Sequence, residues 1–232
     1  MFRKTLKRAV ISSARFARLL PHGVSLAADI KRRIPEFDIR LIFDVGANIG
    51  QAADEFLVQF PRSKIISFEP DPDAFLTLSA RASSHSRLAA YNLGLGDRTE
   101  RVRFDNSSPV SEIHAIAKDQ SNERLPLVDM TTVDEFCALQ GVDHIGLLKI
   151  DTEGNDLNVV AGSAGMLRRG KIDVVLAECS LTQISPRLVS FSELQTAMRS
   201  YGYVCFGIYQ QAFGANPGDH QINWANCAYV RG

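Results

Sequence analysis

The sequence predicts a doubly wound α/β fold, with a mostly parallel sheet of seven strands and an antiparallel terminal strand. Three observations predict it. Short apolar runs of strand length alternate along the chain with amphipathic segments of helix length. Two more strand-like runs follow the last helix, and several apolar runs end on a carboxylate or an amide. Together these features are typical of one domain that binds a ligand at the edge of its sheet.

The predicted elements follow one another in a regular order. Strands are expected at residues 41–45, 64–68, 88–93, 145–150, 172–177, 201–209 and 223–230. Helices are expected at residues 51–57, 72–82, 133–139, 155–167 and 191–200. Residues 101–104 alternate like an exposed strand of a hairpin. The polar stretch 105–126 is predicted to be a loop, where we expect substrate specificity to lie.

The composition is ordinary for a globular protein. The chain has 232 residues, of which 45% are hydrophobic and 22% charged, enough for one large α/β domain. No apolar run approaches the ~20 residues that are needed to cross a bilayer. The four cysteines are widely spaced and form no CxxC pair. This spacing predicts a reducing compartment and gives no sign of a zinc site.

Charge is distributed unevenly, although the net charge is zero. Residues 1–40 hold ten Lys or Arg against three Asp or Glu, so they carry +7 and residues 41–232 carry −7. We therefore expect a basic helical extension over 1–40 and the main domain over 41–232. Residues 1–20 are amphipathic, and two alternatives are a helix that packs on or caps the domain and a helix on a membrane surface. A targeting peptide is disfavoured because charges interrupt the apolar stretch.

A glycine turn between a strand and a helix is the most informative local feature. Residues 46–50 (GANIG) follow the strand 41–45, and Glu69 ends the next strand, nineteen residues after Gly50. Glycine has no Cβ, so a ligand can approach the backbone closely. An acid at the end of the second strand is placed to accept hydrogen bonds from ribose hydroxyls. The sequence therefore predicts a site for a nucleoside.

The spacing of the turn distinguishes between nucleosides. A dinucleotide site uses G-x-G-x-x-G, whereas this turn has two glycines spaced G-x-x-x-G, with Asn48 between them and Asp44 before them. Asp44 would repel a pyrophosphate, but it suits a ligand that carries an ammonium and a sulfonium. That ligand is S-adenosylmethionine. Two structural alternatives stay open, namely Asp44 as a cap of the loop backbone and Glu69 as a charge at a helix N-terminus.

Polar side chains end the predicted strands, at the edge where open α/β sheets bind ligands. These residues are Asp44, Glu69, Asn92, Asp151 with Glu153, and Glu178. Asp151 and Glu153 follow the central strand, so we expect them to meet both the methyl donor and the acceptor. One of these two would serve as the base, with Glu178 next. The acids could instead be structural or ligate Mg²⁺, but no histidine reinforces a metal site and none is predicted.

Histidines and aromatic residues give weaker candidates. His114 and His220 fall in predicted loops that could reach the cleft, although a solvated loop histidine is the commoner outcome. His144 precedes a buried strand and is expected at the far end of the sheet. Candidates for an apolar acceptor wall, or for simple core packing, are Tyr209, Phe213 and Trp224.

Four motifs carry a specific family resemblance. DVGANIG at 44–50, FEP at 68–70, NLGLGD at 92–97 and LKIDTEGND at 148–156 resemble the FkbM family of S-adenosylmethionine-dependent methyltransferases. The resemblance implies a Rossmann-like class I methyltransferase fold, and methyl transfer to a hydroxyl of a sugar, polyketide or other secondary metabolite. It places Asp151 and Glu153 at the reaction centre. The residues that it implies for cofactor binding are Asp44, Gly46, Asn48, Gly50 and Glu69. We add as further candidates for cofactor binding Ala47, Pro70, Asn92 and Asp151.

Other functions are weighed against this one. A nicotinamide-dependent oxidoreductase would need the middle glycine of its motif, where this chain has Asn48. A catalytically silent nucleoside-binding protein is the second alternative. A nucleic-acid partner is disfavoured because residues 41–232 carry −7 and contain no N-P-P-Y motif. We expect a small-molecule acceptor such as a sugar or glycoconjugate, and a cytoplasmic protein, with membrane contact through residues 1–20 as an option. The sequence does not indicate the oligomeric state.

Overall fold

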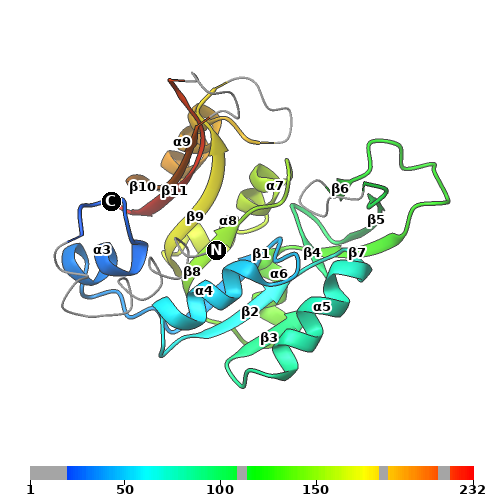
Figure 1. The fold of residues 1–232 in the computed structure, drawn as a ribbon, viewed down its shortest axis with the longest axis horizontal. Helices are drawn as coiled ribbons and strands as arrows, with labels where there is room; N and C mark the ends of the chain where they lie inside the picture. Colours follow the sequence, from blue (N-terminus) through cyan, green and yellow to red (C-terminus); the bar gives the residue numbers. More distant parts are fainter. Residues whose placement is uncertain (1–19, 109–113, 183–187, 214–219) are drawn as a thin grey trace.

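The fold was analysed in a computed structural model that describes residues 20–108, 114–182, 188–213 and 220–232 (Figure 1). The amphipathic helix expected over residues 1–20 lies outside the described residues, apart from Leu20. The chain forms one large sheet with helices on both faces, and a smaller sheet beside it.

The large sheet has seven strands in the order β10-β11-β9-β8-β1-β2-β3. Their bounds are β1 Leu41–Val45, β2 Lys64–Phe68, β3 Leu88–Tyr91, β8 Ile145–Ile150, β9 Ile172–Ser180, β10 Tyr203–Phe213 and β11 Ile222–Arg231. The strands from β9 to β3 are parallel to their neighbours, whereas β11 pairs antiparallel with both β9 and β10. This confirms the predicted doubly wound, mostly parallel seven-stranded sheet with an antiparallel terminal strand.

Helices cover the two faces of this sheet (Figure 1). Their bounds are α3 Leu26–Arg33, α4 Gln51–Gln59, α5 Pro72–Ser83, α6 Val133–Gln140, α7 Asp156–Ala161, α8 Ala164–Arg168 and α9 Phe191–Ser200. Helices α3, α4 and α5 contribute to one apolar cluster, and α6 to α9 contribute to the other. In the second cluster the Phe68 and Phe136 rings pack edge to face with centroids 4.8 Å apart. Both faces of the central strands are therefore covered, which is why β1, β8 and β9 are mostly apolar.

A second sheet of four short strands was not predicted as such. It has the order β4-β7-β5-β6 and is formed by β4 Gly94–Leu95, β5 Glu100–Asp105, β6 Ala115–Ile116 and β7 Leu127–Thr131. The expected strand at 101–104 is part of it, but the stretch 105–126 is not simply a loop, because it contains β6. A small apolar cluster formed by Val102, Phe104, Val128 and Met130 holds this sheet together. Strands this short carry too few residues for a clear alternation.

Two other expected elements differ from the structure. The helix expected over 155–167 is divided into α7 and α8 at Gly162. A Cβ at this glycine would lie 1.9 Å from the carbonyl oxygen of Gly96, so the chain passes directly against the small sheet there. Strand β10 also continues to Phe213, which shortens the loop expected after residue 209.

The segment before β1 packs on the large sheet. Leu26 and Ile30 of α3 are buried in the same apolar cluster as Val174 of β9. The buried carboxylate of Asp29 accepts a hydrogen bond of 3.1 Å from the hydroxyl of Tyr209 on β10. The division of the chain at residue 41 stays a prediction. Within the described ranges, no helix combines the length and the apolar character that a membrane span requires.

Candidate active site

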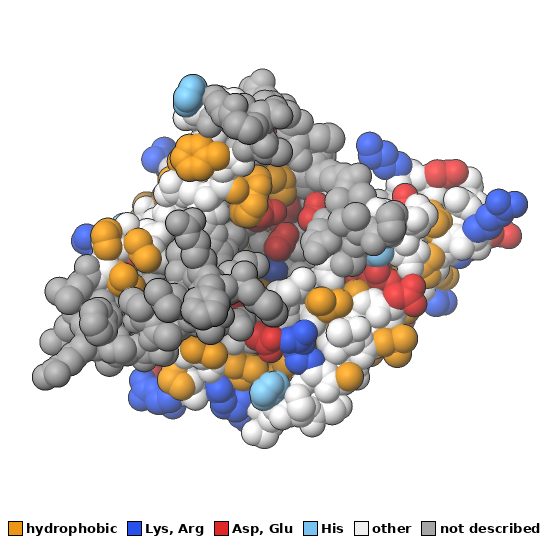
Figure 2. Space-filling model, in the orientation of Figure 1, with side chains coloured by type: hydrophobic (Ala, Val, Ile, Leu, Met, Phe, Trp, Pro, Cys, Tyr) orange, Lys and Arg blue, Asp and Glu red, His pale blue; other side chains and the backbone are white. Residues whose placement is uncertain are grey.

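A cavity of about 360 Å³ lies at the carboxyl edge of the large sheet. Its wall draws on the turn after β1, the ends of β2 and β8, the small sheet, β10 and β11. Figure 2 shows acidic side chains gathered in a hollow near the middle of this face. We call the part around residues 46–50 and Glu69 the turn end, and the part around Tyr209 and Asn226 the strand end. A cavity of this size is typical of a site for a small molecule.

The turn after β1 is shaped by main-chain geometry. Gly46 has φ of 73°, and a Cβ there would lie 1.7 Å from the carbonyl oxygen of Asp151. Glycine alone fits, because both the left-handed conformation and the close approach exclude a side chain. Asn48 also has a positive φ, of 50°, which asparagine tolerates better than most residues. The turn therefore presents backbone rather than side chains to the cavity.

Glu69 ends β2 and is held by two backbone donors. Its Oε2 accepts from the N–H of Asn48 at 2.7 Å, and its Oε1 accepts from the N–H of Asp71 at 2.8 Å. Burial raises the pKa of Glu69 to about 7, while these two hydrogen bonds act in the opposite direction. Each carboxylate oxygen keeps one lone pair for a further donor. Glu69 is thus a rigid acceptor on the cavity wall.

Beneath the turn lies a buried ion pair. Asp44 of β1 and Lys149 of β8 are register partners, and Lys149 Nζ lies 3.2 Å from Asp44 Oδ1. The same ammonium group donates to the carbonyl oxygen of Gly46 at 3.2 Å and lies 3.4 Å from Asp151 Oδ2. Burial lowers the pKa of Lys149, but Asp44 and Asp151 raise it by more, so the group stays charged. Lys149 therefore joins the turn to the end of β8.

Acidic side chains cluster where β8 and β9 end. Asp151 and Glu153 line the cavity, and Glu153 has φ of 51°. Burial raises the pKa of Glu178 to about 8, with further contributions from Asp151 and Glu153. Burial likewise raises the pKa of Asp156, the first residue of α7, to about 6. Burial and mutual repulsion thus work against full ionisation of this cluster, and a positively charged ligand would favour its ionised form.

The structure brings most of the predicted site residues together. Those on the cavity wall are Gly46, Ala47, Asn48, Glu69, Pro70, Asp151 and Glu153. Asp44 lies beneath the wall, and Glu178 lies beside it. Gly50, with φ of 92°, precedes α4, where a Cβ would meet the side chain of Arg81 at 2.8 Å. Asn92 donates to the carbonyl oxygens of Glu69 and Pro70 at 2.9 and 3.0 Å, so it supports the wall from behind. Their roles toward a ligand stay predictions.

Several wall residues were not singled out from the sequence. Lys149 has a visible signal, because it is a lone charge inside the otherwise apolar strand IGLLKI. Gln210 and Asn226 have none, because they come from β10 and β11, and the Asn226 amide donates to Gln210 Oε1 at 2.8 Å. Tyr209, a candidate for the acceptor wall, does line the cavity.

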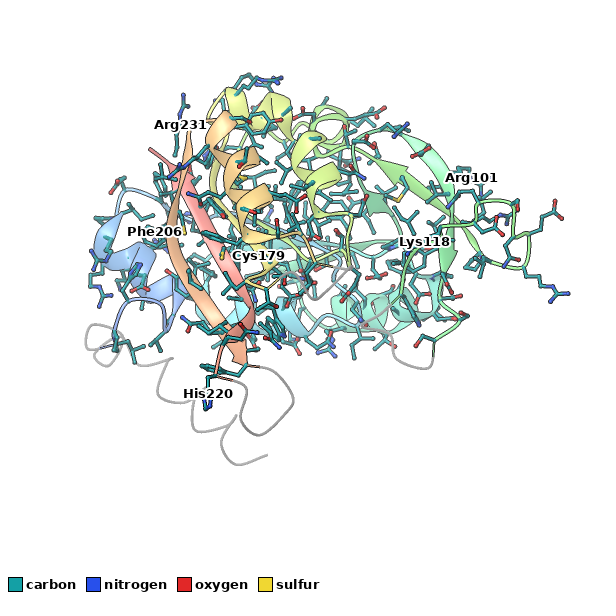
Figure 3. All side chains as sticks on the ribbon, turned by 90° about the horizontal axis from the view of Figure 1, so that it is seen from above. Arg101, Lys118, Cys179, Phe206, His220 and Arg231 are labelled. Atoms are coloured by element: carbon teal, nitrogen blue, oxygen red, sulfur yellow. The ribbon has the colours of Figure 1, made fainter. Side chains whose placement is uncertain are left out.

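The three histidines lie in different places. His114 is on the cavity wall beside Asp71. His144 lies before β8, at the opposite edge of the sheet, where its Nε2 is 2.9 Å from Asp173 Oδ1. His220 is exposed near the tip of the β10–β11 pair (Figure 3). Among the residues that the structure describes, no group of three His, Cys, Asp or Glu is placed to hold a metal ion.

The fold and the site define the class of the protein. A seven-stranded sheet with an inserted antiparallel last strand, a glycine turn after β1 and an acid after β2 are the features of a Rossmann-like class I methyltransferase. The family model described as the methyltransferase FkbM domain matches residues 44–205. The chain belongs to this family.

Three curated relatives are similar over part of their length. The 2-O-methyltransferase NoeI of Sinorhizobium fredii is 24% identical over 56% of this chain and 59% of its own. Methyltransferase 1 of Beauveria bassiana is 28% identical over 54% of this chain and 59% of its own. The hexuronic acid methyltransferase AglP of Haloferax volcanii is 25% identical over 60% of this chain and 55% of its own. Each alignment thus spans little more than half of the relative.

Proposed function

We propose that this protein is an S-adenosylmethionine-dependent O-methyltransferase that acts on a hydroxyl group of a sugar or glycoconjugate. The observation that carries the proposal is the turn end, where a glycine turn and the fixed carboxylate of Glu69 form one wall of the cavity. Membership of the FkbM family supports methyl transfer. The name of one relative, a 2-O-methyltransferase, supports transfer to oxygen, and that of another, a hexuronic acid methyltransferase, supports a sugar acceptor.

The residues present fit the proposed cofactor. Gly46 lets the turn pack against the main chain of Asp151 on the cavity wall, and Glu69 has free lone pairs for ribose hydroxyls. The acidic side chains of Asp151 and Glu153 on the cavity wall suit a ligand with two positive centres. The middle glycine of a dinucleotide motif is replaced by Asn48, which argues against a nicotinamide cofactor.

The chemistry divides between the cofactor and the chain. S-adenosylmethionine supplies a methyl group on a positively charged sulfur. The protein has to align the acceptor hydroxyl with that methyl group and remove the hydroxyl proton. Asp151 is our candidate for the base, because it lines the cavity and Lys149 holds its carboxylate at 3.4 Å. Glu153 is the alternative on the wall. Glu178 is a weaker candidate than either. A base must first lie within reach of the acceptor hydroxyl, whatever its pKa, and Glu178 does not line the cavity.

Isothermal titration with S-adenosylmethionine, and in parallel with NADH, tests the proposal. Glu69→Gln keeps the size of the side chain but removes its charge. We expect wild type to bind the methyl donor and Glu69→Gln to bind it at least about tenfold more weakly, which is ~1.4 kcal/mol. Wild-type affinity should also fall as the pH drops through about 7, because protonation of Glu69 removes the charged acceptor. Glu69→Gln should lack this pH dependence.

The matched control is Glu55→Gln. Glu55 lines the same cavity from α4, so this change also removes one wall carboxylate without touching the turn. We expect it to alter affinity far less than Glu69→Gln. Wild-type protein that binds NADH and not S-adenosylmethionine would overturn the proposed function. A cytoplasmic location and membrane contact through residues 1–20 remain parts of the proposal that need their own experiments.

A further inference from the structure

His114 is placed at the turn end of the cavity with both ring nitrogens engaged. Its Nδ1 lies 2.7 Å from Asp71 Oδ2, and its Nε2 lies 2.8 Å from the carbonyl oxygen of Ser108. Both partners are acceptors. A neutral imidazole has one N–H and satisfies only one of them, whereas the imidazolium satisfies both. The geometry therefore selects the charged form of His114.

Asp71 connects this histidine to the candidate ribose acceptor. Its carboxylate is buried and caps α5, since Asp71 Oδ1 accepts from the N–H of Asp73 at 3.1 Å and from the Asn106 amide at 3.2 Å. The N–H of Asp71 donates in turn to Glu69 Oε1 at 2.8 Å. A continuous series of hydrogen bonds thus runs from His114 through Asp71 to Glu69.

The charges around His114 favour its protonation. The charged groups that act on it are Asp71 at the start of α5 and Glu69 at the end of β2. Burial lowers the pKa of His114, but the hydrogen bond to the Ser108 carbonyl and the charges of Asp71 and Glu69 raise it above its usual value. In return, a positive charge on His114 favours the ionised form of Glu69.

We propose that His114 is a positioning residue for cofactor binding, which as an imidazolium ties Ser108, after β5, to Asp71 at the start of α5 and favours the charged form of Glu69. The inference rests on the proposed methyl-donor site. This role of His114 does not follow from the motifs at residues 44–50 or 148–156, because His114 lies in a different part of the chain, between β5 and β6. It makes the affinity for the methyl donor depend on two linked titrations rather than on Glu69 alone.

The test compares wild type with His114→Gln and His114→Lys in titrations with S-adenosylmethionine between pH 6 and 8.5. In His114→Gln the acid limb due to Glu69 should move to higher pH by about half to one unit, so affinity at pH 7, close to the wild-type pKa of Glu69, falls about two- to fivefold. His114→Lys restores a positive charge and should return the acid limb toward the wild-type position. The α-amino group of the ligand titrates near pH ~8, so variants are compared at equal pH.

The matched control is His144→Gln, which breaks a similar histidine–aspartate contact at the opposite edge of the sheet. It should leave the binding profile unchanged. If the affinity of His114→Gln for S-adenosylmethionine differs from wild type by the same factor at every pH, the role of His114 is merely structural. That result would overturn the inference.

A second measurement needs no ligand and separates this inference from the proposed function. The raised pKa of His114 predicts stability that is present below the ordinary imidazole pKa of ~6.5 and lost as the pH rises through the folded value. The difference in unfolding free energy between wild type and His114→Gln should therefore shrink with rising pH. If this difference in unfolding free energy does not depend on pH, His114 is not bound to Asp71 and Ser108 as an imidazolium. That result would overturn the inference whether or not the cofactor binds.

Discussion

The two ends of the cavity are built in different ways. At the turn end, the contacts are made by main chain: two N–H groups fix Glu69, and Gly46 lies against the carbonyl of Asp151. At the strand end, the wall consists of side chains such as Tyr209 and Asn226 from β10 and β11. The shape of the first end depends on main-chain geometry, whereas that of the second depends on the side chains that β10 and β11 carry. We infer that the turn end sets the cofactor and the strand end sets the acceptor.

The largest effect should come from Asp151→Asn, which lies between the two ends. If Asp151 is the base, turnover falls about 10²- to 10⁴-fold, while affinity for S-adenosylmethionine changes by less than about tenfold. The measurement is transfer of labelled methyl groups to a panel of sugars and uronic acid glycosides, followed by titration of the cofactor. Turnover equal to wild type would remove Asp151 from the mechanism and promote Glu153.

Lys149→Met tests the buried ion pair that joins the turn after β1 to the end of β8. It strands the fully buried Asp44 carboxylate, so we expect a loss of about 3–5 kcal/mol in unfolding free energy, measured by urea denaturation. Adding Asp44→Asn removes the stranded charge and should recover much of that loss. A double variant no more stable than Lys149→Met would show that the loss comes from packing rather than from charge.

Gly46→Ala tests the main-chain character of the turn end, with Gly141→Ala as its control. Both glycines have positive φ, of 73° and 66°, but nothing lies within 4 Å of a Cβ at Gly141. The control therefore carries only the conformational cost of ~1–2 kcal/mol. Gly46→Ala should cost about 1–3 kcal/mol more, because its Cβ meets the Asp151 carbonyl, and should weaken cofactor binding. Equal stability losses in the two variants would contradict the close contact.

The difference between the two ends also explains what the sequence allowed us to predict. The large sheet followed from apolar runs, and the turn end followed from Gly46, Gly50 and Glu69, because main-chain geometry restricts which residues can stand there. The structure confirms that the turn and Glu69 meet at one cavity. Lys149 could have been predicted as a site residue, because it is a charge inside a buried strand, but it was not among the candidates.

The parts of the fold and the site that were not predicted depend on contacts between segments that are distant in the sequence, and no local pattern indicates such contacts. Gln210 and Asn226 reach the cavity only because β11 lies between β9 and β10. The small sheet escaped notice because β4 and β6 have two residues each. His114 was weighed as a loop histidine, and its contact with Asp71 spans 43 residues of sequence.

The place of β11 in the sheet has a consequence for the order in which the protein can form during synthesis. Among the strands that the structure describes, β10 pairs with β11 alone, yet β11 follows it in the chain. When β10 leaves the ribosome, β11 has not yet been made, so β10 lacks the neighbour that it has in the finished sheet. Strand β10 can therefore take its final place only together with β11, or after β11 has paired with β9. The half of the cavity that holds Tyr209 and Asn226 is the last to be completed.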